Sequence, residues 1–173
     1  MTNQNQTLAH VTTQLVRPGP DHRHVFAFDA LMAEDAIRER CPDPRFVMTA
    51  HYTSKKFIIN TDGVATLTPR RDFTVYGVVW EISNVAQIGL DVFMGMPGVF
   101  DRFGSFARGR AGEMISTEYY GARNFKPGKA DPKYLAPIIA AARHWKFPDV
   151  YIDEIASWTR PEPRTAKPKR SPR

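Results

Sequence analysis

A short apolar run near the start of the chain constrains the fold more than any other segment. Residues 25–32, Val-Phe-Ala-Phe-Asp-Ala-Leu-Met, begin as a buried strand and pass at once into a turn and a helix. In an α/β or α+β protein, a turn that leaves the end of a strand presents backbone N–H groups, which suit an anion. Residues 28–31 are therefore the first candidate for a binding loop, although they lack the glycine that close backbone approach normally requires.

The order of the predicted elements favours an α+β protein. The 173 residues suffice for one domain with a sizeable core. A strand and a helix come first, then a block of strands with one helix inside it, and two helices follow. Because this order lacks the repeated strand–helix–strand unit of a doubly wound sheet, we expect a mixed or antiparallel sheet, which can curl into a small barrel.

The expected elements are bounded by turn and capping residues. Strands are expected at residues 24–28, 46–52, 57–60, 64–67, 74–80, 99–107 and 113–120, with turns at 62–63, 69–72 and 108–112. Helices are expected at residues 33–40, after Ser83, from Asp131 to Ala142 and from Pro148 to Trp158. In the second helix Val85, Ile88 and Val92 form an apolar stripe at helical spacing, although Gly89 in its interior disfavours a helix.

The positive charge of the chain lies in its C-terminal segment. Residues 159–173 hold six basic side chains and one acidic side chain, which is +5 of the formal net charge of +6. Because a nucleic-acid-binding domain carries its charge on the folded surface, we expect no nucleic-acid partner. The chain is accordingly divided into an N-terminal arm (1–23), a domain (24–158) and a basic, proline-rich, disordered tail (159–173).

The remaining composition predicts a cytoplasmic protein without cofactor or metal. Cys41 is the single cysteine, so no intramolecular disulfide forms. Of the five histidines only His22 and His24 are close, and no cysteine stands near them, so no metal site is expected. The chain has no apolar segment long enough to span a membrane. It also has no Gly-x-Ser-x-Gly nucleophile elbow, no phosphate-loop lysine motif and no dinucleotide-binding fingerprint.

Several local runs, in this order and spacing, resemble the gamma-glutamylcyclotransferase-like family, which includes the AIG2-like proteins. Residues 25–32 stand where that family has a Phe-Ala-Tyr-Gly-Ser-Asn segment. Residues 63–67 and 75–80 resemble its Ala-Thr strand and its Val-x-Gly-Val-x-Trp strand, and residues 90–95 resemble its Leu-Asp-x-x-Glu-Gly segment. Residues 131–135 and 147–151 resemble its closing helices, so the likeness covers roughly residues 24–158.

The resemblance implies a mixed sheet curled into a small barrel with flanking helices and a pocket at one side. In that family the loop after the first strand holds a gamma-glutamyl group through backbone N–H groups. The glutamate of Leu-Asp-x-x-Glu-Gly is the general base of a metal-free reaction that yields 5-oxoproline and an amine or amino acid. The ligand-binding residues that the resemblance implies here are Phe28, Asp29, Ala30, Leu31, Met94, Gly95, Tyr119 and Tyr120.

The sequence departs from the family at both of these places. Asp29 brings a carboxylate to the loop, and Met94 stands at the base position, where a thioether cannot carry a proton. General-base catalysis contributes on the order of 10² to 10⁴ in rate, so its loss would cripple the family reaction. We therefore expect a non-catalytic ligand-binding protein or an accessory subunit, with a small molecule in the barrel pocket and a protein partner or second copy as its other partners.

Two alternatives stay open. Asp91 lies one helical turn before Met94, and Glu118 lies on a strand beside the two tyrosines, so either is a candidate catalytic acid or base. With such a relocated group the protein is an active cyclotransferase or amide-processing enzyme acting on gamma-glutamyl amines or amino acids. In the other alternative, Asp29 and Met94 mark a pocket rebuilt for a cationic or apolar ligand such as an amine.

Overall fold

The structure, a computed structural model, describes residues 15–161. Most of the predicted arm and tail, residues 1–14 and 162–173, lies outside the described residues. The strands are β1 (Leu15–Val16), β2 (His22–Ala27), β3 (Arg45–Ile59), β4 (Ala65–Ser83), β5 (Phe100–Gly109) and β6 (Met114–Ala122). The helices are the 3-10 turn η1 (Ala30–Met32), α1 (Glu34–Arg38), α2 (Asn84–Phe93), α3 (Pro132–His144) and α4 (Asp149–Ala156).

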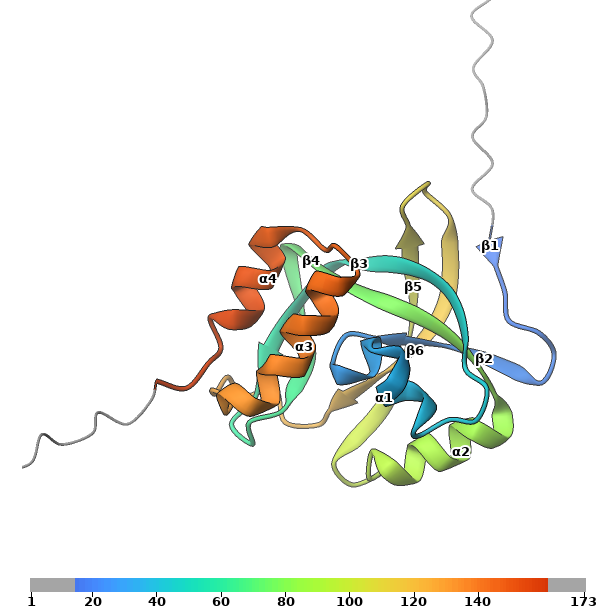
Figure 1. The fold of residues 1–173 in the computed structure, drawn as a ribbon, viewed down its shortest axis with the longest axis horizontal. Coiled ribbons are helices and arrows are strands. Elements are labelled where there is room, and N and C mark those ends of the chain that lie inside the picture. Colours follow the sequence, from blue (N-terminus) through green and yellow to red (C-terminus); the bar gives the residue numbers. More distant parts are fainter. Residues whose placement is uncertain (1–14, 162–173) are drawn as a thin grey trace, which may run out of the picture.

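Within residues 15–161, five strands close into a barrel (Figure 1). Their order is β6, β2, β4, β3, β5, and β5 pairs again with β6. β2 runs parallel to β6, whereas the other neighbours in the barrel are antiparallel. β1, in the segment predicted as an arm, adds a parallel strand to β6, with Leu15 opposite Met114. The predicted α+β fold, a mixed sheet curled into a small barrel, is confirmed.

Two predicted interruptions of the sheet are wrong, because the strands bend there without ending. Residues 46–52 and 57–60 belong to one strand, β3, and the segments at 64–67 and 74–80 belong to β4. The β3–β4 register shifts between Thr53 and Lys55, where Ser54 has a positive φ of 57°. Thr53 pairs with Thr74 and Lys55 pairs with Pro69, so residues 70–73 of β4 stand opposite Ser54 alone. The turn predicted at 69–72 is thus a bulge within β4, and pairing continues on both sides of it.

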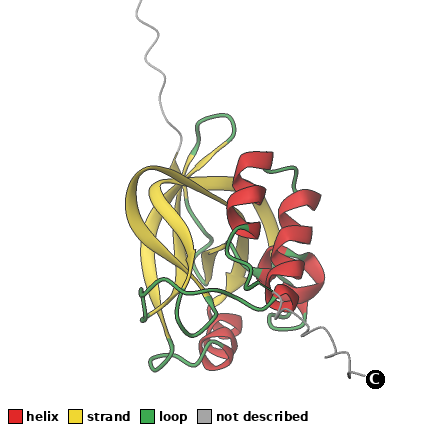
Figure 2. Cartoon of the chain, turned by 90° about the vertical axis from the view of Figure 1, so that its left-hand side faces the viewer, coloured by secondary structure: helices red, strands yellow, loops and turns green. Residues whose placement is uncertain are grey.

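The helices cover separate parts of the barrel (Figures 1 and 2). α3 and α4 lie side by side, and α4 is tied to the barrel because the Tyr151 hydroxyl donates to the Tyr76 carbonyl at 3.1 Å. α3 contributes Leu135 and Ile138 to the core. α2 lies elsewhere, against β2 and β4. A pocket bordered by both helical groups therefore draws residues from distant parts of the sequence.

α2 turns its predicted apolar stripe toward solvent. The hydroxyl of Ser83 caps the helix by accepting from the Ala86 N–H at 3.1 Å, as its sequence predicts. Val85, Ile88 and Val92 are nonetheless 77%, 65% and 75% exposed. The buried residues of the helix are Ala86, Gln87 and Leu90. The predicted helix is therefore present, and the opposite, partly polar face of it packs on the barrel.

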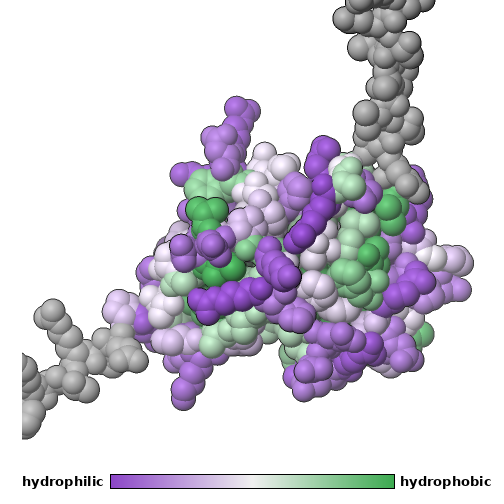
Figure 3. Space-filling view, turned by 45° about the horizontal axis from the view of Figure 1, so that its top comes forward, coloured by the Kyte–Doolittle hydropathy of each residue, from purple (hydrophilic) through white to green (hydrophobic). Residues whose placement is uncertain are grey.

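The surface of the domain is of mixed character. Figure 3 shows one face, on which green apolar areas are separated by a band of purple hydrophilic side chains. Over residues 15–161, no helix is both long enough and apolar enough to cross a membrane. The described part of the chain also contains no group of three or more His, Cys, Asp or Glu side chains placed to hold a metal ion.

Candidate functional site

Two tryptophans hold the loop that follows β2. The indole N–H of Trp80 donates to the Leu31 carbonyl at 3.0 Å, and that of Trp145 donates to the Met32 carbonyl at 2.8 Å. Trp80 belongs to β4, whereas Trp145 follows α3. Both the barrel and the C-terminal helices therefore fix the loop, and its backbone is preorganised before any ligand arrives.

Asp29 begins η1 as its N-cap. Its carboxylate accepts a hydrogen bond from the Leu31 N–H at 2.9 Å. The side chain is half-buried, and burial raises the pKa of Asp29, although hydrogen bonds from the backbone N–H groups of Leu31 and of Asp29 itself oppose this rise. The Leu31 N–H, which the turn after β2 would otherwise present to an anionic ligand, is thus already bonded to Asp29.

A pocket of about 440 Å³ opens beside this loop. It brings together five residues that the sequence analysis singled out for ligand binding, namely Asp29, Ala30, Leu31, Met94 and Gly95. The other lining residues, which that analysis missed, are Ala36, Glu39, Arg40, Val64, Phe93, Val99, Phe100 and Tyr134. The wall is largely apolar and carries two carboxylates and one guanidinium.

The three charged side chains of the pocket wall differ in their partners and in their burial. The guanidinium of Arg40 lies over the ring of Phe93, 4.1 Å from its centroid, so its charge has a cation–π partner. The carboxylate of Glu39 is exposed at the pocket rim. Asp29 is the more buried of the two acids, so it is the carboxylate that a ligand inside the pocket meets with least competition from water.

Met94 forms the end of α2 and part of the pocket wall. It is the C-cap residue of the helix, and its side chain is 7% exposed. Gly95 follows with a φ of 68°, in the left-handed region, and its N–H donates to the Val92 carbonyl at 3.1 Å. The helix therefore stops here because glycine permits the turn, and Met94 is left facing the pocket.

Tyr134 enters the pocket from α3. Its hydroxyl accepts from the Ala65 N–H at 2.9 Å. Burial and the nearby charge of Asp29 raise the pKa of Tyr134 to about 12, so the hydroxyl keeps its proton at neutral pH. The N-cap residue Asp131 predicts helix α3 from the sequence. No local pattern shows that the face with Tyr134 packs beside the loop after β2, about a hundred residues earlier in the chain.

Asp91 and Glu118, the two candidate catalytic residues, lie outside this pocket in a polar cluster. Arg102 bridges them, with Nε 3.3 Å from Asp91 Oδ1 and Nη1 3.1 Å from Glu118 Oε2. The Tyr120 hydroxyl donates to Asp91 at 2.6 Å, and the Gln87 amide donates to Glu118 at 2.7 Å. Both carboxylates are therefore held by protein partners, and neither lines the pocket beside Met94.

The three remaining candidates, Phe28, Tyr119 and Tyr120, are buried aromatic residues that do not line this pocket. Tyr119 packs on Phe28 with ring centroids 6.1 Å apart, and its hydroxyl accepts from Lys55 at 3.3 Å. Tyr120 points to the other face of β6, as alternation along a strand requires. There it borders, with Phe28 and Asp29, a narrow space of about 10 Å³, enough for little more than one water molecule.

Comparison with known proteins identifies the fold. No protein-family model and no curated protein matches the sequence. A solved gamma-glutamyl cyclotransferase matches with a TM-score of 0.74 at 22% identity, over 84% of this chain and 92% of that one. An uncharacterized protein from Homo sapiens matches with a TM-score of 0.74 at 21% identity, over 85% and 93%. An AIG2-like protein from Mus musculus matches with a TM-score of 0.51 at 16% identity, over 66% and 83%.

With identities of 16–22%, these structural matches show the fold and not the chemistry of this chain. The matches to the first two structures cover nearly the whole of each, so the likeness extends over the complete barrel and its helices. The described chain therefore has the fold of the gamma-glutamyl cyclotransferases and AIG2-like proteins, as the sequence resemblance implied.

Proposed function

We propose that the protein binds a small molecule in the pocket beside Asp29 and Met94 without catalysing the cyclotransferase reaction. One observation carries this proposal. In a single pocket wall, a thioether occupies the position that the family resemblance assigns to the general base, and the carboxylate of Asp29 already accepts the Leu31 N–H.

The chemistry of the reaction explains why these two features matter. A substrate ammonium must lose a proton before its nitrogen can attack, and Met94 has no basic lone pair that accepts one at neutral pH. Asp91 and Glu118 are engaged with Arg102 and do not line the pocket, which argues against a relocated base. Asp29 does line it, but its charge repels the α-carboxylate of a gamma-glutamyl substrate at the loop.

The same wall favours a ligand that is apolar and positively charged. Most of the lining residues are apolar. The half-buried carboxylate of Asp29 attracts a cation and repels an anion. The charge of Arg40 is directed onto Phe93. A primary amine with an apolar body satisfies both properties, with its ammonium at Asp29 and its body on the side chains of Met94 and Phe100.

Calorimetry with matched probes tests the ligand class. Phenethylamine, 3-phenylpropanoate and 2-phenylethanol share an apolar body and differ in charge. We expect binding of the amine in preference to the other two, and an affinity loss of about tenfold in Asp29→Asn, because a charge-assisted hydrogen bond is removed. Asp101→Asn, which changes a carboxylate outside the pocket, is the control. Preferential binding of the carboxylate would contradict the proposal.

A second candidate function, a subunit of an assembly, is favoured by the exposed face of α2. Val85, Ile88 and Val92 form this face, and no atom lies within 4 Å of the position a Cβ would take on Gly89 in their midst. The face itself carries no charge, so two copies would not repel each other. A second copy of the chain is therefore the occupant we propose.

Sedimentation velocity of the full chain tests this candidate. Wild-type protein should associate, and Ile88→Lys should abolish association, because it places a charge in the middle of the apolar face. Val150→Lys is a matched control, since Val150 is a 77% exposed residue on a different helix, α4. A wild-type monomer at all concentrations would contradict the assembly.

We also propose a cytoplasmic location. The single cysteine, Cys41, is buried and free, which suits a reducing compartment.

A further inference from the structure

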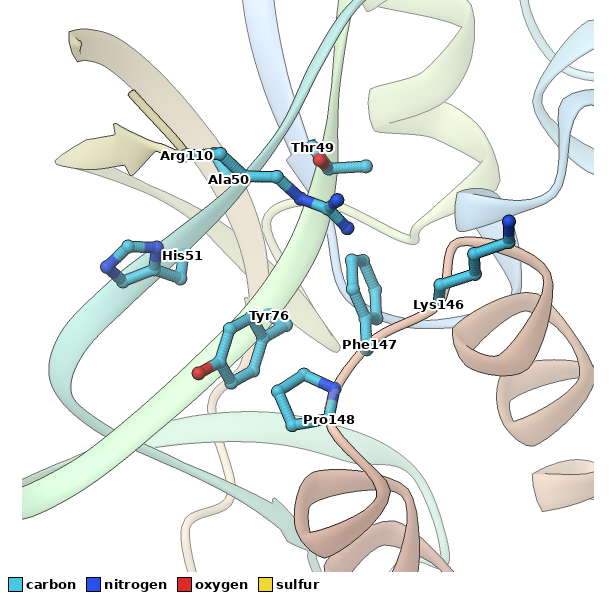
Figure 4. A pocket seen from close by; sticks show the side chains of 8 residues that line it. All are labelled: Thr49, Ala50, His51, Tyr76, Arg110, Lys146, Phe147 and Pro148. Atoms are coloured by element: carbon cyan, nitrogen blue, oxygen red, sulfur yellow. The ribbon is translucent and has the colours of Figure 1, made fainter. Parts of the chain in front are cut away.

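A second pocket, of about 230 Å³, lies between the barrel and the connection from α3 to α4 (Figure 4). It shares no lining residue with the pocket beside Asp29. Its wall comes from β3, β4, the β5–β6 turn and that connection, and consists of Thr49, Ala50, His51, Tyr76, Arg110, Lys146, Phe147 and Pro148. Nothing in the proposed function uses this hollow.

The charged residues that line this pocket are both cations, Arg110 and Lys146. A third cation, Arg108, is close to lining residue His51: burial, and after it the charge of Arg108, lowers the pKa of His51. In the part of the chain that the structure describes, none of Arg108, Arg110 and Lys146 forms an ion pair with a carboxylate. Unpaired cations around a hollow raise the local concentration of anions.

Arg110 is the cation placed to contact a ligand. Figure 4 shows its side chain reaching from the β5–β6 turn across the hollow, with the guanidinium above Phe147. Nη2 donates to the Trp145 carbonyl at 3.3 Å, which tethers the side chain to the opposite wall. A guanidinium has five N–H donors in a planar fork, so donors remain for the two oxygens of an oxyanion.

The floor beneath Arg110 is aromatic and held in place. The rings of Tyr76 and Phe147 lie 5.7 Å apart, and Phe147 is 5% exposed. The Phe147 N–H donates to the Ala142 carbonyl at 3.1 Å, and the Tyr76 carbonyl accepts from Tyr151. A flat apolar group can cover such a floor without reorganising it, which keeps the entropic cost of binding low.

The start of α4 contributes to the same side of the pocket. The helix begins directly after Pro148, and no side chain caps it. Its first N–H groups favour an anion, whereas the carboxylate of Asp149 in the first turn opposes one. This opposition supplies a variant that should strengthen binding, because Asp149→Asn removes the negative charge and leaves the cations in place.

We propose that this second pocket binds a small aromatic phosphate, with the phosphate at the guanidinium of Arg110 and the ring on Tyr76 and Phe147. Phosphate fits better than a monoanion because Arg110, Lys146 and Arg108 together offer more than one positive charge. The proposal is independent of the pocket beside Asp29, since the two pockets have no residue in common.

Calorimetry with phenyl phosphate on the full chain tests the proposal, with inorganic phosphate and phenol as probes of the charge and of the ring alone. Phenyl phosphate should bind at least tenfold more tightly than either. Arg110→Gln should weaken it by about tenfold, the loss expected for a charge-assisted contact. Asp149→Asn should tighten it severalfold, and Asp29→Asn should leave it unchanged.

Arg123→Gln is the matched control for Arg110→Gln. Arg123 is also an exposed arginine that donates to a backbone carbonyl, that of Pro97 at 3.0 Å. It differs from Arg110 in pairing with Asp101 at 2.8 Å and in lining neither pocket, and its substitution removes the same net charge. Equal losses in the two arginine variants would show that net charge alone attracts the probe, and would overturn the proposal. Undetectable binding to wild-type protein at millimolar concentration, or phenol binding as tightly as phenyl phosphate, would also overturn it.

Discussion

The carboxylate of Asp29 accepts a hydrogen bond from the backbone N–H of Leu31, 2.9 Å away, inside a loop that two tryptophan side chains hold. The strand-to-turn geometry of the fold is therefore kept, while an N–H group of the turn is satisfied by the chain itself. The half-buried acid that results is the feature of the pocket most open to experiment.

The stability of the protein should change with pH in a way that depends on Asp29. Burial raises the pKa of Asp29 in the folded state above its ordinary value of 3.8. At pH values between the unfolded-state pKa and the folded-state pKa, the folded state therefore binds more protons than the unfolded state. The free energy of unfolding therefore falls as pH rises through this window. Asp29→Asn keeps an acceptor for the Leu31 N–H but does not ionise, so its free energy of unfolding should not fall in this window.

Thermal unfolding at a series of pH values tests this prediction. Asp29→Asn should melt at a higher temperature than wild-type protein at pH 7, and the difference should shrink as the pH approaches 3.8 from above. An unchanged or lowered melting temperature at pH 7 would show that the ionised carboxylate is better satisfied than the structure indicates.

Two glycines should respond oppositely to substitution by alanine. A Cβ on Gly77 would collide with the Ala27 carbonyl and lie 2.5 Å from Phe26 Cζ, whereas a Cβ on Gly89 meets no atom within 4 Å. We expect Gly77→Ala to lower the free energy of unfolding by about 3 kcal/mol. Gly89→Ala should raise it by about 1 kcal/mol, through helix propensity. Urea unfolding measures both, and equal effects would contradict the packing of β4 on β2.

Glu81 should be far more important to stability than a surface acid. Its carboxylate is buried, lies 3.2 Å from Nε2 of His24 and also accepts from Arg45. Glu81→Gln should lower the free energy of unfolding by about 3 kcal/mol, because a buried pair loses one partner. Glu34→Gln, which breaks an exposed pair with Arg38, should cost less than about 0.5 kcal/mol. Similar losses in urea unfolding would argue against a buried network.

Cys41 should be unreactive in the folded protein. Its thiol is buried, and burial raises the pKa of Cys41 to about 11, so the thiolate is scarce at pH 8. A disulfide reagent such as dithionitrobenzoate should therefore label native protein at least a hundredfold more slowly than protein unfolded in urea. Rapid labelling under native conditions would indicate that the packing around Cys41 opens readily.

Local patterns of the sequence predict the elements better than their orientation. The continuous apolar run at 25–28 and the cap at Ser83 act through neighbouring residues, and both appear in the structure as expected. The bend near Ser54 does not end β3, because pairing with β4 resumes beyond it. α2 instead buries the face that holds Gln87, which donates to Glu118 on β6, and this tertiary contact cannot be read from the helical spacing of Val85 and its neighbours.

The candidate site shows the same limit. Asp29 and Met94 line one pocket, although more than sixty residues separate them, and the family resemblance had already placed them together. Tyr134 could not be found in this way, because its contact with Ala65 arises only when α3 docks on the barrel. Asp91 is one turn from Met94 on the helix, yet Arg102 and Tyr120 hold it away from the pocket.

Formation of 5-oxoproline tests the central claim most directly. Purified protein is incubated with a panel of gamma-glutamyl amines and amino acids. The comparison is the double variant Asp29→Gly, Met94→Glu, which restores the glycine of the loop and the glutamate at the base position. The proposed loss of the base predicts no 5-oxoproline above background from wild-type protein and turnover in the double variant. Turnover by wild-type protein that survives Met94→Ala and disappears in Asp91→Asn or Glu118→Gln would contradict the claim.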